Sequence, residues 1–303
     1  MKAMIFAAGL GTRLKPITDT LPKALVPVCG RPLMEHVMHK LMAAGITESV
    51  VNVHHFADKV EEWIGSQGWI CRDAADMTEG KMMVQVSDER TGLLETGGAV
   101  LHARQYLEGC GSFLIHNVDI LSDCDLSWFA SQVRPEALAT LLVSRRKSSR
   151  YLMFDPQTMR MVGWVNEKTG EMRLAGPWVD ETKCLKLAFS GIHVMSDEIL
   201  EVMHGYALRK GMYIATDKPR FPIVDFYLWA MKKAPIYGAL SNDLKMLDAI
   251  QYSNYEACKE AINSGANIDL LSGNICDRVD NLIEEKNPFI ISCFYRQTLL
   301  TII

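Results

Sequence analysis

The sequence predicts an α/β fold with a mixed, mainly parallel sheet flanked by helices in three layers. The first observation is an uninterrupted apolar run over residues 4–8 that ends at Gly9, which is typical of a strand buried on both faces. The second is the regular alternation of strand-like and helix-like segments over residues 1–119. The third is the composition, because 49% hydrophobic and 22% charged residues are typical of a globular chain.

The segments that follow the first strand support this alternation one by one. Residues 32–44 start with a proline, carry apolar residues at helical spacing and stop at Gly45, so they predict a helix. Residues 48–53 predict a second buried strand, and residues 57–64 predict a second helix. Further strands are expected at 82–87, 112–116, 139–144, 185–195, 236–240 and 244–247. Further helices are expected at 99–106, 126–133, 221–232 and 253–263, with a hairpin over 151–165 and an irregular segment over 166–184.

The bulk properties of the chain exclude several classes of function. The net charge of −4 gives no electrostatic reason to expect nucleic acid or an anionic membrane as a partner. No run of about 18 apolar residues supports a membrane span. The eight cysteines are scattered without zinc spacing, and the N-terminus lacks the pattern of an export signal, so we expect reduced thiols and a cytoplasmic location. We expect one domain over residues 1–265 and an apolar extension over 266–303, with self-association left open.

The loop after the first strand has the residues of a polyphosphate-binding site. Gly9 and Gly11 allow a sharp turn that exposes backbone N–H groups to an anion. Arg13 and Lys23 add two cations, the second on a loop stiffened by a proline. The dinucleotide-binding fingerprint is excluded because its third glycine is replaced by Leu14, and no Gly-Lys-Ser/Thr string of an NTPase loop occurs.

Acidic residues follow two of the later strands. Asp119 comes just after the strand at 112–116, at the sheet edge where open α/β folds bind ligands. A single carboxylate there suits Mg²⁺, which takes one or two protein carboxylates together with phosphates and water. Asp88 or Glu89, after the strand at 82–87, can hydrogen-bond the edge of a nucleotide base, although a polar strand end is an equal interpretation.

The string Gly9-x-Gly11-Thr12-Arg13, followed by a short loop and Pro-Lys23, resembles the signature of the sugar-1-phosphate nucleotidyltransferases. The similarity extends from residue 1 to about residue 262 and is strongest with short, single-domain members that make UDP- or GDP-sugars. It implies the Rossmann-like fold of nucleotide-diphospho-sugar transferases. It also implies Mg²⁺-dependent transfer of a nucleoside monophosphate from an NTP to a sugar 1-phosphate, giving an NDP-sugar and pyrophosphate, with Mn²⁺ able to replace Mg²⁺.

The resemblance also implies roles for individual residues. Lys23 would contact the α-phosphate and the sugar phosphate, and Arg13 the β- and γ-phosphates. The residues implied in nucleotide binding are Ala8, Gly9, Gly11, Thr12, Arg13, Thr96 and Gly97, with Asp88 and Glu89 as the base-edge candidates above. Those implied in sugar binding are Asn117, Glu167, Lys168 and Gly191, and those implied in metal binding are Asp119 and Asp248.

The sequence departs from the family pattern at three places. Val118 stands where the family has glycine, and Thr169 stands where it has proline. Around Asp248 the tryptophan, glycine and threonine of the family string are missing, so the position of this carboxylate is in question. The alternative function from another class is a non-catalytic, nucleotide-sugar-binding regulatory protein on the same fold.

Overall fold

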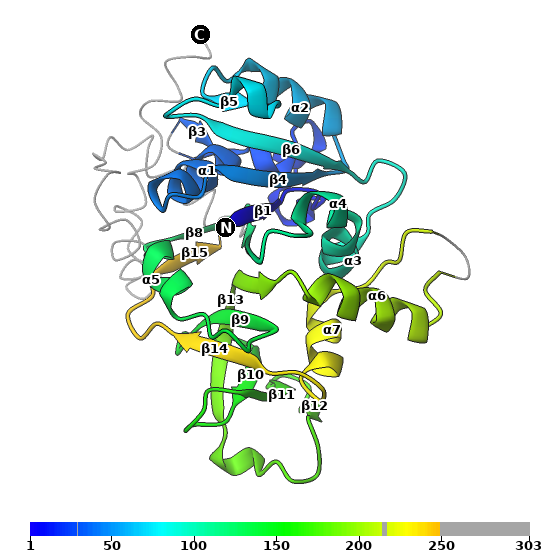
Figure 1. Cartoon of the computed structure of the whole chain (residues 1–303). Helices are drawn as coiled ribbons and strands as arrows, with labels where there is room; N and C mark the ends of the chain where they lie inside the picture. Colours follow the sequence, from blue (N-terminus) through cyan, green and yellow to red (C-terminus); the bar gives the residue numbers. More distant parts are fainter. Residues whose placement is uncertain (29, 214–216, 249–303) are drawn as a thin grey trace.

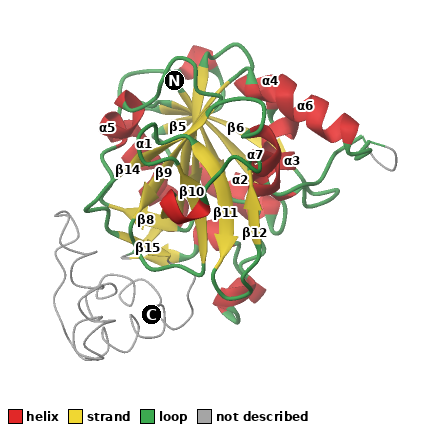
Figure 2. Ribbon diagram, turned by 90° about the horizontal axis from the view of Figure 1, so that it is seen from below, coloured by secondary structure: helices red, strands yellow, loops and turns green. Residues whose placement is uncertain are grey.

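The parallel part of a large mixed sheet forms the N-terminal half of the molecule. The computed structural model describes residues 1–28, 30–213 and 217–248, and eleven strands of this part of the chain form one sheet (Figures 1 and 2). At its centre, β1 (Lys2–Phe6) pairs in parallel with β4 (Glu48–Val53) and with β7 (Ser112–Asn117). Beyond β4, β6 (Met82–Asp88) and β5 (Ile70–Cys71) continue the parallel order. The apolar run after Met1 is therefore the central strand of the fold.

The other half of the sheet is mostly antiparallel. It begins where β13 (Leu185–Ser196) pairs antiparallel with β7. The strands beyond β13 are β10 (Arg150–Phe154), β11 (Met161–Asn166) and β12 (Met172–Leu174). In a separate branch of the sheet, β9 (Ala139–Ser144) pairs with β13, and β14 (Ile236–Leu240) pairs with β9. Two small sheets consist of β2 (Pro27–Val28) with β3 (Arg31–Pro32), and of β8 (Ile120–Ser122) with β15 (Met246–Asp248). The predicted fold class, a mixed sheet flanked by helices, is confirmed.

The central strand contributes side chains to a separate core on each face of the sheet. Ala3 and Ile5 of β1 lie in one core, and Met4 and Phe6 lie in the other, because successive side chains of a strand point to opposite faces. The first core is covered by α1 (Leu33–Ala43), α2 (Ala57–Ser66) and α5 (Leu126–Ser131). The second core is covered by α3 (Glu95–His102), α4 (Arg104–Leu107), α6 (Ile199–Arg209) and α7 (Ile223–Ala230). This arrangement gives the three expected layers.

Several elements differ from the sequence-based expectation. The helix expected at 99–106 starts at Glu95 and is interrupted at Ala103, and the segment 166–184 contains the short strand β12. Helix α6 was not predicted, although its apolar residues recur at helical spacing. The helix expected at 253–263 and the extension 266–303 lie outside the described residues. In the part of the chain that the structure describes, no helix has the length and apolar character needed to cross a membrane.

Candidate active site

The glycine loop at the carboxyl end of β1 adopts the predicted sharp turn. Gly11 has φ +63°, in the left-handed region that favours glycine, and an added Cβ would lie 2.8 Å from the side-chain methyl group of Thr18. The amide of Leu14 donates to the Gly11 carbonyl at 2.8 Å and closes the 3₁₀ turn Thr12–Leu14. Thr12 and Arg13 are exposed on this turn. The loop therefore presents Arg13 at the edge of the sheet where β1 ends.

Lys23 and Asp119 form a mostly buried ion pair beside this loop. Lys23 Nζ lies 3.0 Å from Asp119 Oδ2, and the two side chains are only 11% and 8% exposed. A Cβ on Gly9 would lie 3.2 Å from Lys23 Nζ, so Gly9 provides room for the ammonium group. The structure thus brings together three predicted residues from two segments: the loop after β1 and the segment after β7.

The second oxygen of Asp119 is suited to a cation. Asp119 Oδ1 is buried and accepts no hydrogen bond within the described residues. An unpaired buried carboxylate oxygen is costly, and hard oxygen donors are the ligands that Mg²⁺ prefers. The donor chemistry of Asp119 therefore fits the metal that the sequence implies.

Strand pairing brings the backbone of Asp248 close to that of Asp119. Strand β15 pairs antiparallel with β8 (Figure 1). The register sets Asp248 opposite Ile120, the residue after Asp119. The missing tryptophan, glycine and threonine around Asp248 have therefore not prevented this segment from reaching the site. The role of Asp248 as a metal ligand stays a prediction.

Of the four residues implied in sugar binding, Asn117 and Gly191 lie together. They lie on the adjacent strands β7 and β13, where His116 pairs with Ile192. Gly191 has φ +78°, and a Cβ there would lie 2.5 Å from Asn117 Nδ2, so any side chain at 191 would displace the amide of Asn117. The absence of a side chain at Gly191 thus leaves room for the amide of Asn117. The sequence alone did not show that Asn117 requires glycine at this position.

Glu167 and Lys168 lie elsewhere, on the exposed turn after β11. Glu167 Oε1 pairs with Lys186 Nζ of β13 at 2.8 Å. The pairing of β11 with β10 places this turn next to Ser149, whose carbonyl accepts from the Glu167 amide at 2.9 Å. The contact of Glu167 and Lys168 with a sugar stays a prediction.

A cavity of about 410 Å³ lies between the antiparallel strands and α7. Phe189, which lines it, is two residues from Gly191 on β13, and Pro222, on the opposite wall, precedes α7. The remaining walls include Arg150 and Trp164, which sequence reasoning did not single out. An exposed or half-buried arginine and tryptophan on strands were the available signal, and the pairing of these strands was needed to interpret it.

The first turn of α3 is held by the segment before α7 and by the start of α7. The Gly97 amide donates to the Phe221 carbonyl at 2.8 Å, and the Ile223 amide donates to Thr96 Oγ1 at 2.9 Å. A Cβ on Gly97 would lie 2.4 Å from the Phe221 ring, so this glycine is required for close packing. Glu95 has φ +60°, an uncommon conformation for a residue other than glycine, and its carboxylate pairs with Arg220 Nε at 2.9 Å. The predicted nucleotide contacts of Thr96 and Gly97 stay predictions.

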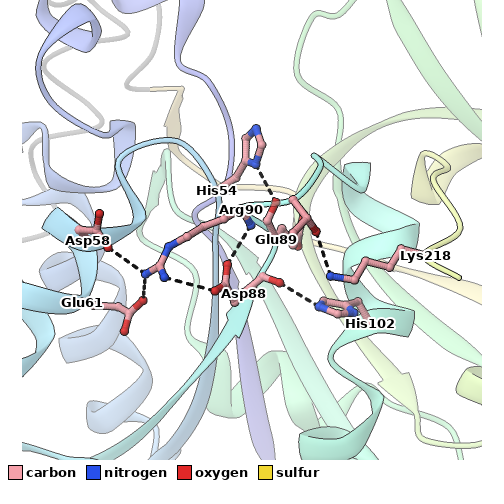
Figure 3. A network of polar contacts seen from close by, with 9 residues as sticks. His54, Asp58, Glu61, Asp88, Glu89, Arg90, His102 and Lys218 are labelled. Carbon is pink, nitrogen blue, oxygen red and sulfur yellow. Dashed lines mark hydrogen bonds and ion pairs between the residues drawn. The ribbon is translucent and has the colours of Figure 1, made fainter. Parts of the chain in front are cut away.

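Asp88 and Glu89 have different surroundings, as Figure 3 shows. Asp88 is exposed, and its carboxylate accepts from the Arg90 amide at 2.8 Å, while the Arg90 side chain also contacts Asp58 and Glu61. Glu89 is fully buried, and both of its carboxylate oxygens accept hydrogen bonds within the chain. Burial raises the pKa of Glu89, and the bonds from Asn52 and the Leu94 amide oppose this rise. A base contact by either residue stays a prediction.

Comparison with known proteins shows the family of the chain. A family model described as nucleotidyl transferase matches residues 2–206, and the chain therefore belongs to the nucleotidyl transferase family. An N-acetylmuramate alpha-1-phosphate uridylyltransferase of Caulobacter vibrioides is 44% identical over 117 residues, 39% of this chain and 45% of the relative. A protein of the same description from Neisseria meningitidis is 38% identical over 127 residues, 42% of this chain and 50% of the relative. The matches span about half the length of these curated relatives.

Solved structures share the fold at low identity. A UDP-glucose pyrophosphorylase from Acinetobacter baumanii has a TM-score of 0.64 and 18% identity, over 94% of this chain and 99% of that one. HddC from Yersinia pseudotuberculosis complexed with GMP-PN has a TM-score of 0.59 and 20% identity, over 85% and 98% of the two chains. These likenesses show the nucleotide-diphospho-sugar transferase fold.

Proposed function

We propose that this chain transfers a nucleoside monophosphate from an NTP to a sugar 1-phosphate, giving an NDP-sugar and pyrophosphate. The observation that carries the proposal is the Lys23–Asp119 pair beside the glycine loop, with one Asp119 oxygen left for a cation. Membership of the nucleotidyl transferase family supports it. The relatives' descriptions name uridylyl and guanylyl transfer, and we propose one of these activities and, as the product, a precursor of the cell wall or of a polysaccharide. No comparison favours the non-catalytic alternative.

The reaction needs charge neutralisation and positioning and little proton chemistry. An oxygen of the sugar 1-phosphate attacks the α-phosphorus of the NTP, and the bond from this phosphorus to the oxygen bridging to the β-phosphate breaks. Lys23, which lies beside the glycine loop, would neutralise charge on the α-phosphate, and Arg13, on the exposed turn after Gly11, would hold the β- and γ-phosphates. Asp119 and Asp248 would hold Mg²⁺, which when bound supplies positive charge to the phosphate oxygens.

The acceptor sugar is proposed to occupy the cavity between β13 and α7. Its volume of about 410 Å³ is within the range of small-molecule sites. Gly191 is two residues from Phe189 of the cavity wall along β13, and Asn117 lies beside Gly191 on the adjacent strand β7. Trp164 and Phe189 offer apolar faces, and Arg150 offers hydrogen-bond donors to a polar sugar.

A grid of four nucleoside triphosphates against several sugar 1-phosphates, assayed for pyrophosphate release with Mg²⁺, tests the proposal on the full chain. We expect one pair to be turned over well above the rest, and the kcat of the Asp119→Asn variant on that pair to be about 10²–10³-fold lower. A folded protein that releases no pyrophosphate with any pair contradicts the proposal. Binding of an NDP-sugar without turnover would then favour the regulatory alternative.

We also propose a cytoplasmic location. It is supported by the free thiols in the described part of the chain, which are Cys71, Cys110, Cys124 and Cys184.

A further inference from the structure

Two buried polar residues lie side by side at the carboxyl ends of β4 and β6. Asn52 is the penultimate residue of β4 and is 4% exposed, and Glu89 directly follows β6 and is 0% exposed. A carboxylate at such a site is costly unless its oxygens accept hydrogen bonds. The contacts of Glu89 therefore need an explanation, and the transfer reaction itself makes no use of them.

The contacts of this pair form a continuous path between two loops. Asn52 Oδ1 accepts from the amides of Ala7 and Ala8 at 2.8 and 3.4 Å. Asn52 Nδ2 donates to Glu89 Oε1 at 2.7 Å, and Glu89 Oε2 accepts from the Leu94 amide at 3.1 Å. Ala7 and Ala8 open the glycine loop, and Leu94 directly precedes α3. Two side chains thus connect the phosphate side and the base side of the site.

The backbone of Glu89 is itself fixed. Its amide donates to the Val53 carbonyl at 2.8 Å, and its carbonyl accepts from His54 Nδ1–H at 2.8 Å and from the Gly92 amide at 2.9 Å. Figure 3 shows the His54 ring directed at Glu89. The Glu89 backbone is therefore fixed, and from it the carboxylate contacts Leu94 directly and the glycine loop through Asn52.

We propose that Asn52 and Glu89 are positioning residues that set the separation of the loop Ala7–Arg13 from the start of α3 at Leu94–Gly98. The two segments then hold the triphosphate and the base of one NTP in register. This inference rests on the proposed function for its kinetic consequence. Neither residue contacts the reacting atoms, so both act through the loop amides that they bind.

The hydrogen-bond pattern allows a test in which the amide of position 52 and the carboxylate of position 89 are exchanged. Glu89→Gln alone turns an amide N–H₂ toward another donor, either Asn52 Nδ2 or the Leu94 amide. Asn52→Asp alone sets one carboxylate against another. In the double variant N52D/E89Q the new amide nitrogen at 89 donates to the carboxylate at 52, and the other oxygens still accept from Ala7 and Leu94. The double variant keeps the shape, the net charge and every partner, with only the middle bond reversed.

We expect each single variant to raise the KM for the NTP about tenfold or more, because a hydrogen bond to a charged group is lost. The KM for the sugar 1-phosphate should be unchanged. The double variant should return to within about threefold of the wild type. Ser49→Ala is the matched control, because Ser49 is also buried on β4 but hydrogen-bonds Met82, away from both loops. It should leave both KM values unchanged.

Amide hydrogen exchange at Ala7, Ala8 and Leu94 supplies a readout that needs no activity. We expect faster exchange at these amides in the single variants and restored protection in the double variant. If the wild type turns over no substrate pair, the proposed function fails, while the exchange data still test the connection between the loops. If a single variant does not fold, the double variant decides. Unchanged KM and unchanged exchange in folded single variants, or a double variant no better than the worse single, would overturn the inference.

Discussion

Exchange of Asp119 for asparagine removes one negative charge from the site and leaves its shape unchanged. The structure predicts two separate effects. Catalysis loses the carboxylate that would hold the cation, and the loss of one electrostatic contact of this kind lowers kcat by about 10²–10³-fold. Stability falls as well, because Lys23, whose Nζ lies 3.0 Å from Asp119 Oδ2 and whose side chain is only 11% exposed, loses its charged partner.

The size of the stability effect follows from the burial of the pair. Removing one partner of a buried ion pair costs about 3–5 kcal/mol, and the asparagine oxygen can still accept from Lys23 Nζ, so we expect the lower end of this range. A domain with about 5–15 kcal/mol of stability should remain folded at 25 °C. Lys23→Ala should be more costly for the same reason, because it leaves Asp119 with two unpaired oxygens.

The double variant K23M/D119L separates the two effects. Replacement of a buried ion pair by apolar residues of similar volume is often neutral or stabilising, so we expect its urea midpoint to be at or above that of Asp119→Asn. Its pyrophosphate release should nevertheless be undetectable. Wild-type turnover in folded Asp119→Asn would refute the catalytic assignment. A double variant less stable than both single variants would refute the account of the ion pair.

Three further predictions concern the same region. Gly9→Ala places a Cβ 3.2 Å from Lys23 Nζ, so kcat should fall about tenfold as the ammonium shifts, while the urea midpoint changes little; an unchanged kcat would contradict this role of Gly9. Excess chelator should abolish pyrophosphate release, and Mg²⁺ or Mn²⁺ should restore it; full activity in chelator would exclude the metal. Burial lowers the pKa of His116 to about 4 and that of His193 to about 3, from 6.5. The unfolded chain therefore binds more protons, and stability should fall as pH drops below 6.5, by up to about 3 kcal/mol through His116 alone. Urea titrations at several pH values on the wild type and on His116→Gln check this, and equal slopes would contradict it.

Local features of the site could be predicted from the sequence. The turn at Gly11 and the strand before it depend on residues next to one another, so the glycine spacing and the apolar run were sufficient. The position of Asp119 also followed, because a residue after a buried parallel strand lies at the binding edge of the sheet. The parallel half of the fold was predictable for the same reason.

Features that depend on the packing of distant segments could not be predicted. Gly9 and Gly97 carry no positive φ, and their need for a missing Cβ comes from Lys23 and Phe221, which reach them only in the folded chain. The connection through Asn52 requires that β4 and β6 be neighbours. Helix α6 is a different case, because its spacing of apolar residues was visible in the sequence.

The short ribbon of β8 and β15 bears on the order in which the site is assembled during synthesis. It contains only three residue pairs, and a two-stranded ribbon of this kind is marginal in water by itself. A nascent chain that extends to β14 can already form the Lys23–Asp119 pair, whereas Asp248, which we propose as a second metal ligand, is added only once β15 has been made and has docked on β8. We therefore expect this segment of the proposed metal site to form last and to detach first in partial unfolding. Any ion held between the two segments would oppose that detachment by the free energy of its binding.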